Sequence, residues 1–311
     1  MEDLHIGIDV SKDRLDIHVH PRGERFEASN DAQGIEALVM RLGPPQKVAC
    51  VCLEASGGVE MAAAVALAGA GFAVAVVNAS QVRGFASAIN RRAKTDALDA
   101  ELIARFSASV KPPVRPLPDE EMQAFGALVA RRRQLLKMRA GEQQRLAQTT
   151  SPVMLKSIKR MIGALTRELE LLEEDIDKSV RGSPVWQVRA DLLASVPGVG
   201  TVTARTLIAE MPELGSLSPR QVASLAGLAP FTRQSGKWKG KSFTGGGRAS
   251  VRTALFMAAL SACRHNPPLA HLYDRLIRNG KAKMVAIIAV ARKLLTILNA
   301  IVRDNKTWQI A

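Results

Sequence analysis

The chain has 311 residues, which is too long for one ordinary hydrophobic core and predicts two or three packed units. Lysine and arginine number 43 against 29 acidic residues, so the net charge is +14 and a polyanion such as nucleic acid is the expected partner. Three cysteines without a CxxC pair argue against a disulfide framework or a zinc knuckle and indicate a reducing compartment.

Segments that would target the chain to a membrane or a secretion pathway are not expected. The N-terminal MEDLHIGIDVSK lacks a basic region followed by an apolar region. An apolar run at 284–301 is interrupted by Arg292 and Lys293, which would be costly at a bilayer centre. We therefore expect a cytoplasmic protein with a buried C-terminal helix and no membrane contact.

The first 110 residues alternate strand and helix patterns. Three consecutive strands followed by alternating helix and strand predict a mixed sheet with helices on its faces, an α/β domain at 1–112. Strands are expected at 4–10, 14–20, 25–28, 47–53 and 72–78, and helices at 31–42, 58–70, 80–89 and 95–107.

A proline-rich segment marks the first domain boundary, because residues 111–118 contain four prolines and cannot continue a helix. Two helices are predicted beyond it, on either side of a turn at 149–152. The second has apolar residues at alternating spacings of three and four, which is typical of a coiled-coil seam. We expect an antiparallel coiled-coil hairpin at 117–181, with a plain helical linker as the alternative. The seam residues are Leu155, Ile158, Ile162, Leu165, Leu169, Leu172 and Ile176.

The remaining segment, 185–311, predicts a mainly helical C-terminal domain. Between Glu213 and Asp274 it has no acidic residue, which indicates a phosphate-binding surface. Glycines at 236, 240 and 245–247 would let the backbone approach a phosphate closely. The apolar helix that follows favours an anchored loop over a disordered one. Candidate nucleic-acid contacts are Arg233, Lys237, Trp238, Lys239, Lys241, Arg248 and Arg252.

The turn PGVG at 197–200 is similar to a helix-hairpin-helix element. In such an element the backbone N–H groups at a helix start face a DNA phosphate, so Gly198 and Gly200 are further candidates. Contacts of this kind hold DNA without reading its sequence.

Four acidic residues lie at the ends of predicted elements in the first domain. Asp9 is inside the apolar segment IGIDVSK, where a charge is costly unless something pairs with it. Glu54 ends the strand VACVCLE, and Asp96 and Asp99 share one face of a predicted helix. Such a cluster repels itself unless divalent cations neutralise it, and oxygen ligands suit Mg²⁺ or Mn²⁺. The pattern predicts a metal-dependent centre for phosphodiester chemistry.

These segments resemble the DEDD transposases of bacterial insertion sequences. GIDVSK with Asp9, LEASGG with Glu54 and KTDALDA with Asp96 and Asp99 occur in the family's order, and with the C-terminal motifs the resemblance covers nearly the whole chain. The resemblance implies an RNase H-like N-terminal domain, similar to the Holliday-junction resolvase RuvC, with these acids as metal ligands. It also implies recombination of DNA element ends with a target, a structured guide RNA, and a homodimer or homotetramer.

In the same family a serine followed by glycine lies in a basic stretch, and RQSGKWKG matches this pattern at Ser235. The resemblance implies that Ser235 joins DNA as a 5′-phosphoserine while the metal ions activate the scissile phosphate. Ser242 and Ser250 are nearby competitors, and a serine that bonds its own turn is the plain alternative. Because the acids and the serine are on different domains, the site could combine two protomers.

Two other functions stay open on the sequence. A RuvC-like endonuclease would cleave with metal-activated water, and a non-catalytic nucleic-acid-binding protein would use its acids structurally. His18 and His20 have the spacing of a metal-binding pair in nicking enzymes that use tyrosine, but Tyr273 is the only tyrosine. We therefore assign both histidines to the exposed face of an alternating strand.

Overall fold

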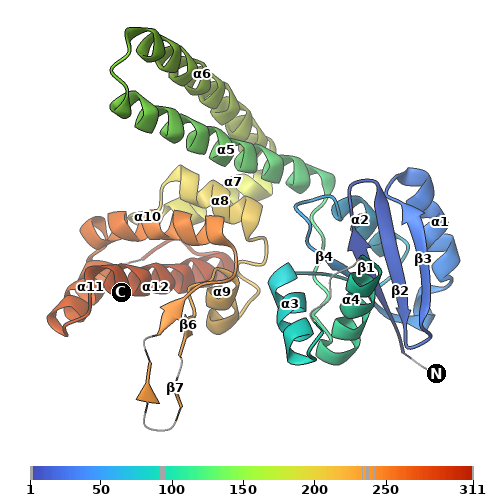
Figure 1. Cartoon of the computed structure of the whole chain (residues 1–311). Helices are drawn as coiled ribbons and strands as arrows, with labels where there is room; N and C mark the ends of the chain where they lie inside the picture. Colours follow the sequence, from blue (N-terminus) through green and yellow to red (C-terminus); the bar gives the residue numbers. More distant parts are fainter. Residues whose placement is uncertain (1–2, 92–95, 233, 236–237, 241, 310–311) are drawn as a thin grey trace. The chain divides into compact units, whose positions relative to one another are not determined.

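The computed structural model describes residues 3–91, 96–232, 234–235, 238–240 and 242–309, and of these 96–98, 234 and 238–239 by their backbone only. The chain forms two compact units, Met1–Leu117 and Pro118–Ala311, and the boundary between them in the sequence lies in the proline-rich segment. The predicted combination of an α/β part and a mainly helical part is confirmed (Figure 1). A separate domain at 117–181 stays a prediction.

The first unit is built on a five-stranded mixed sheet with the strand order β3-β2-β1-β4-β5. β1 pairs antiparallel with β2 and β2 with β3, while β4 is parallel to both β1 and β5. The strands are β1 (Leu4–Val10), β2 (Arg14–His20), β3 (Glu24–Ser29), β4 (Val48–Glu54) and β5 (Val74–Val77).

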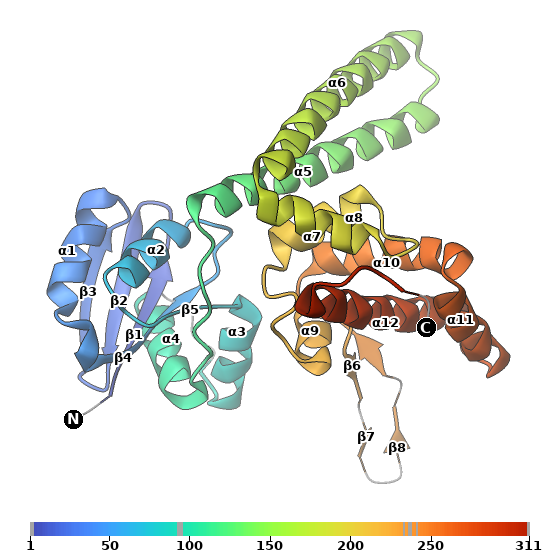
Figure 2. The same cartoon turned by 180° about the vertical axis from the view of Figure 1, so that it is seen from behind.

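Helices cover both faces of this sheet (Figures 1 and 2). On one face, α1 (Ala32–Leu42) and α2 (Met61–Gly69) pack on the apolar side chains of the strands, among them Ile6, Ile8 and Leu53. On the other face, α4 (Asp96–Val110) packs on β1, β2 and β4, and α3 (Ala79–Ala88) packs on α4. A short 3-10 helix, η1 (Pro45–Lys47), leads into β4.

The face under α4 carries the polar residues of the strands, because successive side chains of a strand point to opposite faces. Ile6, Ile8 and Val10 face α1 and α2, so His5, Gly7 and Asp9 face α4. His18 lies on the same face, and its assignment to an exposed surface was wrong: it is 4% exposed. The covering helix comes from about 80 residues further along the chain, which is why the local alternation did not reveal it.

Two buried histidines make the stability of the first unit depend on pH. His5 Nδ1 forms a hydrogen bond with Ser107 Oγ at 2.9 Å. Burial lowers the pKa of His5 and that of His18 below the ordinary value of 6.5. The unfolded chain therefore takes up protons that the folded chain does not, and the free energy of unfolding should decrease as the pH falls through 6.5.

Urea titrations at pH 7.5 and 5.5 measure this pH dependence. We expect the unfolding midpoint to fall between the two conditions, and to fall less in His18→Gln, in which only His5 still resists protonation. His271→Gln is the control, because His271 is exposed in the second unit and should leave the pH dependence unchanged. Equal pH dependence in His18→Gln and the wild type would contradict the assignment.

The second unit begins with two long helices, α5 (Glu120–Gln148) and α6 (Pro152–Gly182), which pack against each other (Figure 1). The side chain of Asp119 accepts a hydrogen bond from the N–H of Met122 and caps α5. Most of the predicted seam of α6 is buried, and coiled-coil packing itself stays a prediction. The buried seam residues are Ile158, Leu165, Leu169, Leu172 and Ile176.

Six further helices of the described part of this unit surround one core. The helices are α7 (Pro184–Ala194), α8 (Thr201–Glu210), α9 (Pro219–Leu225), α10 (Ala249–His265), α11 (Pro267–Arg278) and α12 (Lys283–Asp304). α12 is long and apolar enough to cross a membrane, but in the folded unit its Val290, Leu294 and Leu298 are fully buried in the helical core. This supports the predicted core helix.

Four two-residue strands that the sequence did not predict interrupt the helices of this mainly helical unit. They pair as β6 (Pro230–Phe231) with β9 (Phe243–Thr244) and β7 (Gln234–Ser235) with β8 (Trp238–Lys239). The Phe231 and Phe243 rings stack at 5.5 Å between centroids. Strands of two residues are too short to give a periodic signal in the sequence.

Candidate functional site

Two of the four predicted acids lie on neighbouring parallel strands. β1 and β4 pair with Ile8 opposite Leu53, so Asp9 and Glu54 each follow the last registered pair by one residue. Both carboxylates therefore belong to the carboxyl end of the sheet, at the same edge. The parallel register brings together residues that are 45 positions apart in the sequence.

Helix α4 runs antiparallel to β1, so its first turn comes toward this edge of the sheet. Ser107 of α4 lies at His5, whereas a Cβ atom built on Gly7 would lie 2.2 Å from the carbonyl oxygen of Ala100 and 2.3 Å from the backbone nitrogen of Ala104. With rises of about 3.3 Å per strand residue and 1.5 Å per helix residue, these contacts place the first turn of α4 beside Asp9. That turn carries Asp96 and the half-buried Asp99.

Gly7 is therefore the point at which helix and sheet approach most closely. Gly7→Ala should push α4 off β1 and destabilise the first unit by about 1–3 kcal/mol, the usual cost of overpacking. Because α4 carries two of the acids, metal affinity and DNA cleavage should fall as well. Urea denaturation and Mn²⁺ titration measure the two effects.

A matched glycine gives the control for this substitution. Gly84 lies in α3, and a Cβ atom added there meets nothing within 4 Å, so Gly84→Ala should leave the fold unchanged or slightly more stable. A Gly7→Ala variant as stable and as metal-binding as Gly84→Ala would show that α4 is not held at this glycine.

Asp16 is a fifth acid at the site that the sequence analysis did not identify. It lies directly opposite Asp9 in the antiparallel register of β1 and β2, on the face under α4, and is 7% exposed. Arg14 Nε donates to Asp16 Oδ2 at 3.0 Å and offsets part of the negative charge. The signal was present in RLDIHVH, where an aspartate takes an inward position of an alternating strand.

The donor set at this edge suits a hard divalent cation, because it consists of carboxylate oxygens only. Among the side chains that the structure describes, no three His, Cys, Asp or Glu residues come close enough together to hold a metal ion; the side chain of Asp96 lies outside that part. Cys50 and Cys52 lie on the same face of the sheet, and burial raises the pKa of both thiols, which disfavours a thiolate ligand.

Ser235 lies in the small hairpin β7–β8, opposite Trp238 in the register. It is exposed, as a nucleophile that meets DNA has to be. Trp238 and Lys239 form β8, while Arg233, Lys237 and Lys241 lie outside the described residues.

The glycine-rich segment that follows is anchored by two of the predicted nucleic-acid contacts. Arg248 makes a two-pronged ion pair with Glu213, at 2.6 and 2.7 Å, and Arg252 Nη1 donates to the carbonyl oxygen of Gly246 at 2.5 Å. Gly247 has φ +58° and lies so close to Gly227 that a side chain would not fit. In this structure both arginines brace the loop, and their contacts to nucleic acid stay predictions.

The PGVG turn joins α7 to α8, and its assignment as a helix-hairpin-helix element stays a prediction. Gly198 has φ +100°, and a Cβ atom there would lie 2.6 Å from the backbone of Ala262 in α10, so this glycine is needed for packing. Gly200 caps the N-terminus of α8, and nothing lies within 4 Å of a Cβ atom built on it. The start of α8 is thus open to a phosphate at Gly200, whereas Gly198 holds the turn against α10.

Comparisons with known proteins agree with these features. A model described as a transposase of DEDD type from IS110 matches residues 6–154, and the Transposase IS116/IS110/IS902 family matches residues 190–274. The pilin gene-inverting protein of Moraxella lacunata is 30% identical over 99% of this chain and 98% of its own length. An IS110 protein of 43.6 kDa from Streptomyces coelicolor is 29% identical over 51% of this chain and 39% of its own length.

Proposed function

The chain belongs to the IS110 family of insertion-sequence transposases, and from this premise we propose that it recombines DNA with metal ions held by four acids and with Ser235 as the nucleophile. The observation that carries the proposal is the antiparallel course of α4 along β1. This course supports a shared site, because the first turn of α4, which carries Asp96 and Asp99, would then lie near Asp9 in β1 and near Glu54 at the end of β4. The strand order β3-β2-β1-β4-β5 supports an RNase H-like, RuvC-like unit.

The four acids would hold Mg²⁺ or Mn²⁺ at this edge. Bound ions of this kind polarise a scissile phosphate and offset the charge that develops on its oxygens. The carboxylates would hold the ions, and Arg14 forms an ion pair with the fifth acid, Asp16, which lies opposite Asp9 in the register. The buried apolar core beneath β1 and β4 keeps both strands rigid, so the donor atoms stay at fixed positions.

Ser235 is the serine in this region whose surroundings best suit attack on DNA. Its hydroxyl oxygen would form a bond to phosphorus while the bond to the 3′ oxygen breaks, which leaves a 5′-phosphoserine and a free 3′ hydroxyl. Ser250 donates its hydroxyl hydrogen to Glu210 and is held in α10. Ser242 is exposed but lacks the following glycine of the family pattern, so it serves as the natural control.

Acids and serine belong to different compact units, and we propose that the composite site joins two protomers of a dimer or tetramer. The α5–α6 pair, with exposed Val153, Met154 and Met161, would contribute to the contact between protomers. The net charge of +14 suffices for DNA and for a structured guide RNA, both in the bacterial cytoplasm.

A recombination assay tests the proposed function. Purified protein is incubated with a plasmid that carries the element ends, a target plasmid and the element's RNA, with Mg²⁺ or with EDTA, and junctions are sequenced. We expect junctions with Mg²⁺ only. Junctions that form equally in EDTA would contradict the metal-dependent centre, and junctions that form equally without RNA would contradict the guide.

A further inference from the structure

Three arginines surround one buried glutamate of α4. Glu101 of α4 accepts hydrogen bonds from Arg25 of β3 and from Arg91, the latter at 2.7 Å, and it forms an ion pair with Arg105, one helical turn further on, at 2.8 Å. The four residues come from three separate segments of the first unit. We call Arg25, Arg91 and Arg105 the arginine cluster.

The charges of this cluster do not balance. Three guanidinium groups against one carboxylate leave two positive charges, and each guanidinium has five N–H donors whereas the carboxylate has about four acceptor sites. The Glu101 side chain is 6% exposed, while those of Arg25, Arg91 and Arg105 are 49%, 39% and 42% exposed. Glu101 thus holds the arginines together from beneath, and their remaining donors face solvent.

Two buried nitrogen atoms at the cluster lack a hydrogen-bond partner in the described part of the chain. They are the Nε atom of Arg105 and the Nδ1 atom of the neighbouring His18. Three ion pairs with the arginines hold the Glu101 carboxylate at the centre of the cluster.

The cluster lies on the same face of the sheet as the acids. Asp9 is opposite Asp16, and His18, two residues along β2, is opposite Arg25 of β3. With strands about 4.8 Å apart and about 3.3 Å per residue, the backbones of Asp9 and Arg25 are on the order of 12 Å apart. A few nucleotides of a strand bound at the acids would span this distance.

We propose that the arginine cluster, organised by Glu101, binds a backbone phosphate of the nucleic-acid strand that enters the acidic centre. Guanidinium groups suit this ligand because their paired N–H donors match the geometry of a phosphate. The inference rests on the proposed function, since it takes the ligand to be nucleic acid. The contact is to a phosphate, so it carries no base preference.

The test is a binding measurement on the full-length protein without divalent cations, which separates it from cleavage. Labelled single-stranded DNA, duplex DNA and single-stranded RNA of one sequence are titrated at several salt concentrations. We expect Arg25→Gln/Arg91→Gln to weaken binding about 5- to 10-fold and to reduce the slope of log affinity against log salt by about 0.7–0.9, the contribution of one phosphate contact. The nucleic acid for which the variant changes the salt slope is the one whose phosphate the arginine cluster binds.

Two further variants separate a phosphate site from general charge and from misfolding. Arg25→Lys/Arg91→Lys keeps the charges and should retain most of the slope. Arg41→Gln removes an exposed arginine of α1, on the opposite face of the sheet, and should leave the slope unchanged. Thermal unfolding confirms that each variant is folded. The phosphate site would be overturned if Arg25→Gln/Arg91→Gln kept the wild-type salt slope, or if Arg41→Gln reduced the slope equally. A wild-type protein that binds none of the three nucleic acids would overturn the proposed function as well.

Discussion

Asp9→Asn is expected to reduce DNA cleavage by about 1,000-fold or more, which corresponds to about 4 kcal/mol of lost transition-state stabilisation. In the proposed centre Asp9 has the central position: Asp16 lies opposite it in the register of β1 and β2, and Glu54 follows the Ile8–Leu53 pair on the neighbouring strand. The amide has the same shape as the carboxylate but no charge to bind a cation. Cleavage of labelled end DNA in Mg²⁺ measures the effect.

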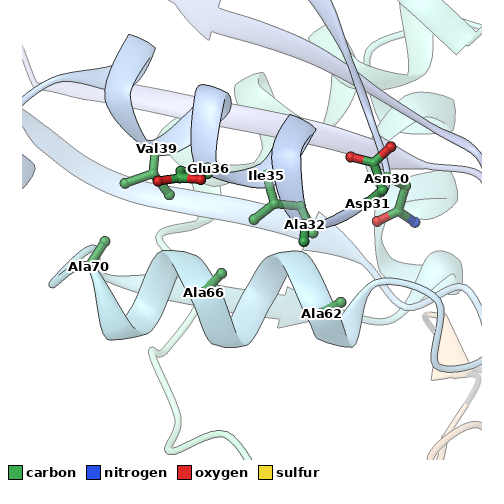
Figure 3. Close-up of a pocket in the computed structure, with 9 residues that line it drawn as sticks. All are labelled: Asn30, Asp31, Ala32, Ile35, Glu36, Val39, Ala62, Ala66 and Ala70. Carbon is green, nitrogen blue, oxygen red and sulfur yellow. The ribbon is translucent and has the colours of Figure 1, made fainter.

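Glu36→Gln provides the control for Asp9→Asn. Glu36 is exposed on α1, beside a groove between α1 and α2 (Figure 3). These two helices cover the face of the sheet opposite the one under α4. The groove has a volume of about 510 Å³, and its walls are mainly alanine, valine and isoleucine, with Asn30, Asp31 and Glu36 as the polar residues. Glu36→Gln should cleave at the wild-type rate. Similar losses in both variants would indicate a general charge effect.

Ser235→Ala is expected to abolish strand joining, with a loss of at least about 1,000-fold, because no covalent intermediate can form without the hydroxyl. The substitution removes one exposed oxygen from a two-residue strand and should not change the stability of the second unit. DNA binding should also stay at the wild-type level. Recombination measured by junction sequencing, together with a binding titration, tests these expectations.

Ser242→Ala is the matched control, since Ser242 is exposed in the same segment seven residues later. We expect it to recombine like the wild type. If Ser242→Ala lost joining and Ser235→Ala kept it, the nucleophile would be the second serine and the family pattern at RQSGKWKG would have misled the assignment.

The arrangement of the first unit was predictable because its strands have strong local patterns. IGIDV and VACVCLE are apolar enough to be recognised, and each has its acid in the last two residues of the strand. The meeting of the two acids then follows from parallel pairing alone. What the sequence could not show was the course of α4: Gly7 and Ser107 fix it, and nothing in either residue's neighbourhood indicates the other.

Burial by distant elements explains the two errors in this unit. His18 and Asp16 lie in an alternating strand, and alternation distinguishes two faces without saying which face water reaches. Because α4 covers the polar face, His18 is buried and Asp16 joins the acids. The arginine cluster was missed for the same reason, since Arg25 and Glu101 are 76 residues apart.

In the second unit the sequence identified basic residues but not their partners. Arg248 lies within a long stretch without acids, yet it forms an ion pair with Glu213, which directly precedes that stretch, 35 residues earlier. A count of charges within a segment cannot reveal an ion pair between a residue inside the segment and one outside it. The exposed setting of Ser235 was likewise out of reach, because β7 and β8 are two residues long.

The most direct test of the account is a search for a covalent link between protein and DNA. Purified wild type, Asp9→Ala and Ser235→Ala are incubated with Mg²⁺, the element's RNA and a nicked end-DNA substrate that traps intermediates, and the products are separated on a denaturing gel. The account predicts a protein-linked DNA band in the wild type that is lost in both variants. Cleavage without a linked band, unchanged in Ser235→Ala, would contradict it and point to an endonuclease that uses metal-activated water.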